Sequence, residues 1–185
     1  MTQHRDASKL YGVLSVSAYD TITGKRTFHS VKKNQVTNVG RIVVLDLLAQ
    51  IDVSSPETAQ MYPAYNQIWS LSIGDSPIPA VATDDKLWSS RYSQSLSPIT
   101  ERIKIKAAYE IRITAEVAAG DATDVVLTEA GLFTRGYQNK PDIVYTTWES
   151  IPFRRMYARQ THPAFTKGAT MRVVYEWTLG MTVSS

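Results

Sequence analysis

The residues that could carry acid–base, nucleophilic or metal chemistry are few and far apart in the sequence. Histidine occurs at His4, His29 and His162, and no two of these have the spacing of paired metal ligands. No serine lies in a G-x-S-x-G motif, which would expose it as a nucleophile. An active site needs a nucleophile or a metal together with convergent partners. We therefore expect the histidines to be surface or capping residues and the protein not to be an enzyme.

Acidic residues offer two further candidates for chemistry. Asp75, Asp84 and Asp85 lie in one segment rich in turn residues, and loop carboxylates are the ligands that Ca²⁺ prefers. Their spacing lacks the D-x-[DN]-x-[DN]-G order of a calcium-binding loop, so turn and capping roles are favoured. Glu129 would be a single catalytic acid, but glycoside hydrolysis needs a second carboxylate and the sequence nominates none. We expect residues 128–131 to form a corner between strands, with no metal or cofactor bound.

A group of basic residues lies close in sequence to aromatic ones: Arg154, Arg155, Arg159 and Lys167 beside Trp148, Phe153 and Tyr157. Such a group can neutralise phosphates and stack on bases, so nucleic-acid binding is one alternative. Acidic residues, among them Glu149 and Glu176, are interspersed with the basic ones. Arginine and aromatic residues are also enriched at protein interfaces. We favour a protein interface over nucleic acid.

The composition indicates one ordinary globular domain. The chain has 185 residues, 43% hydrophobic and 20% charged, with a net charge of +3, and this length suits a single core. Cysteine is absent, which excludes disulfides, thiolate catalysis and cysteine-based metal sites. The N-terminal residues lack the apolar centre of a signal peptide, and no apolar run approaches the roughly 18 residues of a membrane helix. We expect a protein that is made and assembled in the cytoplasm, without a membrane segment.

Alternating apolar and polar residues predict that most of the chain is β-strand. Between residues 103 and 117 every odd position is apolar, which fits one long strand or a bent strand that passes between two sheets. The same period of two runs from Met171 to Leu179. Pro163 is expected to end regular structure. Shorter strands are expected at residues 10–19, 27–31, 67–73 and 125–127, with a hairpin turn at 20–24 and a polar connection at 32–35.

One helix is expected, with Asn38 as its N-cap and an apolar side along residues 39–51. A surface loop should follow at residues 52–66, and Leu87 and Trp88 should fix a Pro/Ala-rich loop to the core. Many short strands with a single helix predict a mainly β fold. The expected architecture is a jelly-roll-like or immunoglobulin-like β-sandwich with one α-helix near residues 39–51, in a single domain of residues 1–185.

Several short segments, taken in order, resemble a widespread group of bacteriophage virion proteins described as tail-fibre, baseplate or collar components. The resemblance covers most of the chain beyond residue 35. Its segments are V-T-N-V-G-R at 36–41, a strand ending in glycine at 70–74 before the Pro/Ala loop, T-E-A-G-L-F at 128–133, M-Y-A-R at 156–159 and W-T-L at 177–179.

The resemblance implies a non-enzymatic structural part of a tailed phage, assembled in the host cytoplasm and resident in the virion. It also implies a homo-oligomer in three-, six- or twelve-fold placement that contacts other virion proteins. A tail, baseplate or neck-collar position is expected. A capsid decoration protein and a carbohydrate-binding, receptor-recognising β-sandwich are the alternatives.

The chain departs from the pattern of this group by an inserted segment, residues 135–155, where a short turn usually joins T-E-A-G-L-F to M-Y-A-R. This segment is more apolar than a free loop needs, and we expect it to dock a neighbouring subunit. The interface residues predicted on this basis are Tyr137, Tyr145, Trp148, Ile151, Phe153, Arg154 and Arg155.

Overall fold

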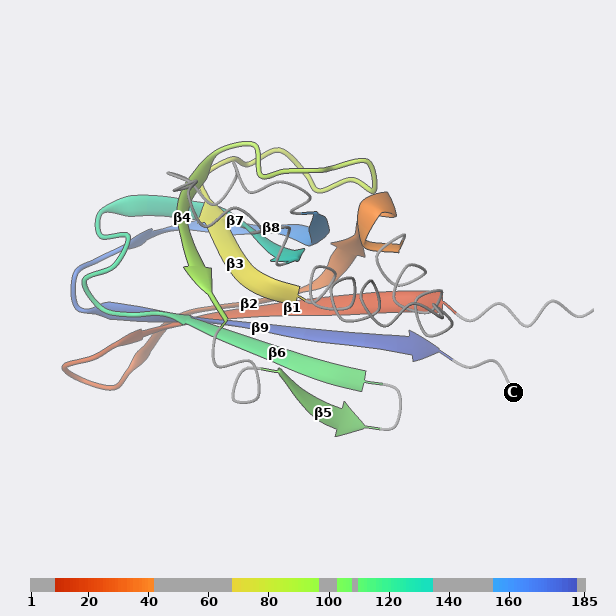
Figure 1. The fold of residues 1–185 in the computed structure, drawn as a ribbon. Helices are drawn as coiled ribbons and strands as arrows, with labels where there is room; N and C mark the ends of the chain where they lie inside the picture. The colour runs from red at the N-terminus through yellow and green to blue at the C-terminus, as the bar shows by residue number, and fades with distance from the viewer. Residues whose placement is uncertain (1–8, 42–67, 97–102, 108–109, 135–154, 183–185) are drawn as a thin grey trace, which may run out of the picture.

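The computed structural model describes residues 9–41, 68–96, 103–107, 110–134 and 155–182 (Figure 1). These residues form nine β-strands and one short helix at residues 38–41, and none of their helices is long and apolar enough to cross a membrane. The strands are β1 (Lys9–Asp20), β2 (Arg26–Val36), β3 (Ile68–Gly74), β4 (Ser90–Ser95), β5 (Ile103–Ala107), β6 (Glu110–Val117), β7 (Val125–Thr134), β8 (Met156–Lys167) and β9 (Met171–Thr182).

All strand pairs are antiparallel, and the strands form two sheets that share β2. One sheet has the order β2-β1-β9-β6-β5 and the other the order β2-β8-β7-β3-β4. Most of β2 pairs with β1, whereas its last residues, Gln35 and Val36, pair with Arg159 and Ala158 of β8. Strand β2 therefore passes from one layer to the other (Figure 1). The expected mainly β sandwich is confirmed.

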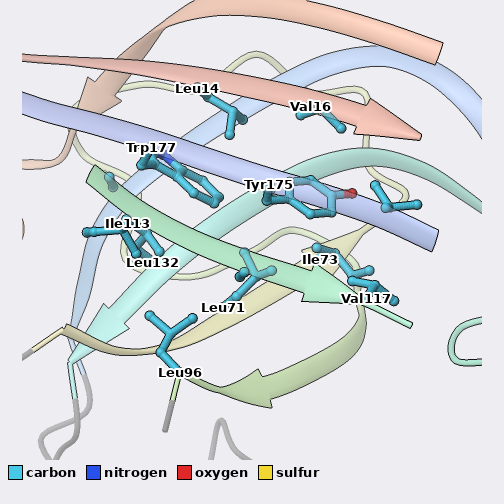
Figure 2. Close-up of a cluster of buried hydrophobic side chains, with 14 of the residues drawn as sticks. Leu14, Val16, Leu71, Ile73, Leu96, Ile113, Val117, Leu132, Tyr175 and Trp177 are labelled. Atoms are coloured by element: carbon cyan, nitrogen blue, oxygen red, sulfur yellow. The ribbon is translucent and has the colours of Figure 1, made fainter. Parts of the chain in front are cut away.

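The core lies between the two sheets and is built from the residues predicted by the period of two. Tyr175 and Trp177 of β9 are completely buried, together with Leu14 of β1 and Leu71 and Ile73 of β3. Figure 2 shows how side chains from both sheets fill this space. Full burial of one such aliphatic side chain contributes about 1.5–3 kcal/mol. The two layers are thus held together mainly by apolar contact.

The prediction of one long strand over residues 103–117 is wrong. This stretch contains two strands, β5 and β6, which pair with each other with Ile103 opposite Ile113 and Ile105 opposite Ile111. The paired residues are both odd-numbered, so the chain reverses direction without changing which face the odd positions occupy. The alternation in the sequence is therefore the same for a hairpin and for a single strand.

Strands β2, β7 and β8 are longer than predicted. The polar stretch at residues 32–35 continues β2 because β1 pairs with it along most of its length. Residues 128–131 lie inside β7 and do not form a corner, and Pro163 lies inside β8 and does not end it. Pro163 is accommodated in β8 by an irregularity in its pairing with β7. Leu127 pairs with Phe165 and Glu129 with Thr161, so Thr128 alone stands opposite three residues of β8. A bulge accommodates proline because no ladder N–H is needed there.

The helix begins at residue 38, one residue earlier than predicted, and its N-cap is Thr37 and not Asn38. The Thr37 side-chain oxygen accepts a hydrogen bond from the Gly40 N–H at 2.9 Å, and the Thr37 carbonyl accepts one from the Arg41 N–H at 3.1 Å. The rest of the predicted helix and the predicted 52–66 loop lie outside the described residues. Leu87 is buried as expected, whereas Trp88 is exposed and does not reach the core.

Candidate functional site

Three charged side chains, Arg159 of β8, Glu129 of β7 and Asp84, form a buried ion cluster beside the second sheet. The guanidinium of Arg159 lies with Nη2 2.7 Å from Glu129 Oε2 and with Nη1 2.9 Å from Asp84 Oδ2. The exposed fractions of the three side chains are 0% for Arg159, 0% for Glu129 and 3% for Asp84. We call this group the Arg159 cluster. Buried charges of this kind are tolerated only when they are paired and hydrogen-bonded, as they are here.

The strands position the cluster through one close backbone approach. Glu129 pairs with Thr161 on β8 and with Gly74 on β3, so its carboxylate lies over the end of β3. A Cβ atom on Gly74 would lie 2.6 Å from Glu129 Oε1 and would collide with the carbonyl oxygen of Ser89. Glycine is therefore required at the end of β3 for the carboxylate to fit.

The Arg159 cluster binds the backbone of residues 75–89, which we call the 75–89 loop. Arg159 donates to the carbonyl oxygens of Ile78 at 2.8 Å and Pro79 at 3.3 Å. Glu129 accepts from the N–H of Ser89 at 2.8 Å and of Trp88 at 3.4 Å. The 75–89 loop contains no helix or strand, so these side chains supply hydrogen bonds that secondary structure would otherwise provide. Figure 1 shows the loop, in yellow-green, running over the second sheet.

Thr37 and the short helix join the same region. The Thr37 hydroxyl donates to the carbonyl oxygen of Met156 at 2.7 Å, and the Asn38 N–H donates to the carbonyl oxygen of Ala82 at 2.7 Å. A Cβ atom on Gly40 would collide with the Tyr157 carbonyl oxygen, so the helix packs directly on the backbone of β8. Four of the five segments that carry the phage resemblance thus meet around one structural unit. The fifth contributes Trp177 to the core.

Most of the predicted interface residues, Tyr137, Tyr145, Trp148, Ile151, Phe153 and Arg154, lie outside the described residues. Arg155 is described and is half-buried, directly before β8. Its carbonyl oxygen accepts a hydrogen bond from the Thr134 N–H at 2.9 Å, and its own N–H donates to the Thr134 hydroxyl at 3.0 Å. Thr134, the last residue of β7, is therefore hydrogen-bonded to the residue that precedes β8.

The aspartates of the predicted loop group have separate roles. Asp84 belongs to the Arg159 cluster and also accepts a hydrogen bond from the Val81 N–H at 2.8 Å, which agrees with the predicted capping role. Asp75 lies 2.7 Å from Nε of Arg91. A hydrogen bond from the Ser89 side chain, with a smaller contribution from Arg91, lowers the pKa of Asp75 below its ordinary value. Asp85 is exposed.

The histidines do not all match the prediction. His29 is exposed, and its ring lies 2.9 Å from the Ser17 hydroxyl, while His4 lies outside the described residues. His162 is buried, which corrects the expectation that it is a surface or capping residue. Its ring packs with Phe28, Phe165 and Tyr175 at centroid distances of 6.1, 5.5 and 5.9 Å. Burial lowers the pKa of His162 to about 4.

The charged groups of the Arg159 cluster bind one another and the backbone of the 75–89 loop. Within the described ranges no group of three or more histidine, cysteine or acidic residues could hold a metal ion. The sequence analysis singled out Glu129, Arg159 and Asp84 individually but did not predict their contact. A signal for that contact was present in the sequence, since Glu129 and Arg159 each interrupt an apolar run, in T-E-A-G-L-F and M-Y-A-R. A charge in such a run needs a buried partner.

No protein-family model, curated protein or solved structure matches the chain.

Proposed function

We propose that the protein is a non-enzymatic structural component of a tailed-phage particle. In this role it is a tail, baseplate or neck-collar protein that oligomerises and attaches to other virion proteins. The observation that carries the proposal is the meeting of four segments of the phage resemblance around the Arg159 cluster. These segments are far apart in the sequence, and together they hold the 75–89 loop and the short helix on the second sheet.

The chemistry of the cluster supports a structural role. The carboxylate oxygens of Glu129 accept hydrogen bonds from Arg159 and from the loop backbone, and the side chain has no exposed surface. A general acid or base must come within hydrogen-bond distance of its substrate, and this carboxylate is sealed from solvent. A loop fixed by buried charges is instead suited to presenting side chains to a neighbouring protein with little loss of conformational entropy on binding.

The experiment that tests the proposal is immunogold labelling of the phage particles whose genome encodes the chain, with an antibody raised against the purified protein. Gold at the tail tip or neck is the expected result. Gold on the head would establish the capsid decoration alternative. Immunoblotting of denatured particles serves as the control for epitopes that are covered in the assembly, and particles negative in both assays would refute a virion role.

A carbohydrate-binding module is the second candidate, and the exposed side chain of Trp88 favours it, because an exposed indole can stack on a sugar face. The neighbouring polar groups argue against it: Asp84 and Asp75 are engaged within the chain and not directed to a ligand. A glycan array probed with the isolated protein and with Trp88→Ala would separate the two roles. Only a lectin should give binding that the substitution removes.

A further inference from the structure

Three of the large apolar side chains exposed in the described part of the chain belong to the 75–89 loop. Ile78 is 45% exposed, Val81 48% and Trp88 55%. Their backbone groups are all bound by the Arg159 cluster: the Ile78 carbonyl by Arg159, the Val81 N–H by Asp84 and the Trp88 N–H by Glu129. The three residues are therefore held close to one compact buried cluster while their side chains stay exposed. We call these three residues the apolar patch.

The loop that carries the apolar patch is also fixed to the protein by contacts outside the Arg159 cluster. Besides the cluster, Leu87 is buried in a small group with Phe133 and Met156 directly beneath the loop. The Asp75 N–H also donates to the Ser89 carbonyl at 3.1 Å, which closes the base of the loop. A rigid apolar surface loses little conformational entropy when a partner covers it.

Two exposed residues of opposite charge lie close to Trp88 along the loop. Asp85 and Lys86 are exposed, whereas the residues on either side of them, Asp84 and Leu87, are buried. No hydrogen bond or ion pair with another described residue engages either side chain. An apolar centre with a charged rim is the usual composition of a protein interface. A rim that carries one negative and one positive side chain next to each other is complementary to itself after rotation about a two-fold axis.

We propose that two copies of this chain associate through the apolar patch about a two-fold axis. Trp88, Ile78 and Val81 of each copy form the centre of the contact, and Asp85 of each copy pairs with Lys86 of the other. Aliphatic neighbours around Trp88 favour a protein surface over a saccharide, which needs hydrogen-bonding side chains beside the stacking ring. A two-fold contact does not close a ring by itself; it joins two copies, or two stacked rings of three or six copies.

Three side chains cover much less than the roughly 800 Å² per partner of a standard stable interface. The dimer is therefore weak and forms reversibly in solution. In a symmetric assembly, other contacts hold the copies together and raise the effective concentration of one copy near the next, so that even a weak contact forms. The contact is a property of the chain alone, so it can hold or fail independently of whether gold labels a phage particle.

Sedimentation velocity of the full-length protein over a wide concentration range measures the association. Wild type should shift from monomer toward dimer as concentration rises, and Trp88→Ala should weaken the dimer by about tenfold or more, as expected for a central aromatic contact. Ile22→Ala is the matched control: Ile22 is 79% exposed but lies at the β1–β2 turn, away from the patch. It should associate like wild type. Circular dichroism and thermal midpoints would verify that every variant is folded.

A charge exchange provides the second, independent test. Asp85→Lys and Lys86→Asp should each weaken the dimer, because each places like charges opposite one another across the two-fold axis. The double variant restores opposite charges in exchanged positions and should recover wild-type association at low salt. A wild-type protein that stays monomeric, a Trp88→Ala protein that associates like wild type, or a double variant that is no better than the single ones would each overturn the proposal.

Discussion

The buried histidine of β8 predicts a pH-dependent stability that can be measured on the purified protein. His162 packs among Phe28, Phe165 and Tyr175, and its Nδ1 lies 3.0 Å from the Pro163 carbonyl oxygen. Burial lowers the pKa of its imidazole from 6.5 to about 4. Between these two values the unfolded chain holds a proton on His162 and the folded chain does not. Acid therefore favours the unfolded chain, and stability falls as the pH drops from 6.5 to about 4.

The size of the effect follows from the size of the shift. One unit of pKa corresponds to about 1.4 kcal/mol, so the lowering of the His162 pKa amounts to about 3 kcal/mol of unfolding free energy lost by pH 4. Domains of this size are stable by only about 5–15 kcal/mol, so the loss is a large part of the total. The carboxylates with a lowered pKa, such as Asp20 and Asp75, lose their contribution to stability only below their ordinary pKa of 3.8. That pH lies outside the range from 6.5 to 4 in which His162 acts.

The assay is equilibrium urea unfolding between pH 4 and pH 7, applied to wild type and to His162→Leu. The leucine variant should lose the histidine contribution, so the difference between the two unfolding free energies should change by about 3 kcal/mol across the range. His29→Leu is the control, because it removes an imidazole that is exposed in the folded chain. A His162→Leu curve parallel to wild type would show that His162 is not buried as a neutral ring.

Three further substitutions test the site, each by urea unfolding at neutral pH. Arg159→Met leaves the Glu129 carboxylate buried without its cation and should cost about 3–5 kcal/mol, whereas a loss below 1 kcal/mol would mean that the cluster is open to water. Gly74→Ala places a methyl group against Glu129 and should cost about 1–3 kcal/mol; wild-type stability would contradict the close approach at the end of β3. Thr37→Val removes the N-cap and should cost about 1 kcal/mol, while Thr37→Ser should retain most of the stability.

The sequence predicted the sandwich because burial in a sheet is a local, periodic property. Each strand alternates between a dry and a wet face, so β1, β3 and β9 could be located from their own residues. The helix start, predicted to within one residue, was also a local property, since a capping residue needs only the next turn. The error of one residue in the cap arose because Thr37 and Asn38 are both good caps, and only the contact of Thr37 with β8 selects between them.

The folded chain alone decided the order of the strands, the β5–β6 reversal and the burial of His162. It also decided the contact between Arg159 and its two carboxylates, which lie 30 and 75 residues away in the sequence. The sequence showed that Glu129 and Arg159 interrupt apolar runs, but not which charge would neutralise which. That choice depends on how the sheets pair and where the 75–89 loop crosses them, because the energy of a buried charge is set by neighbours in space and not by neighbours in sequence.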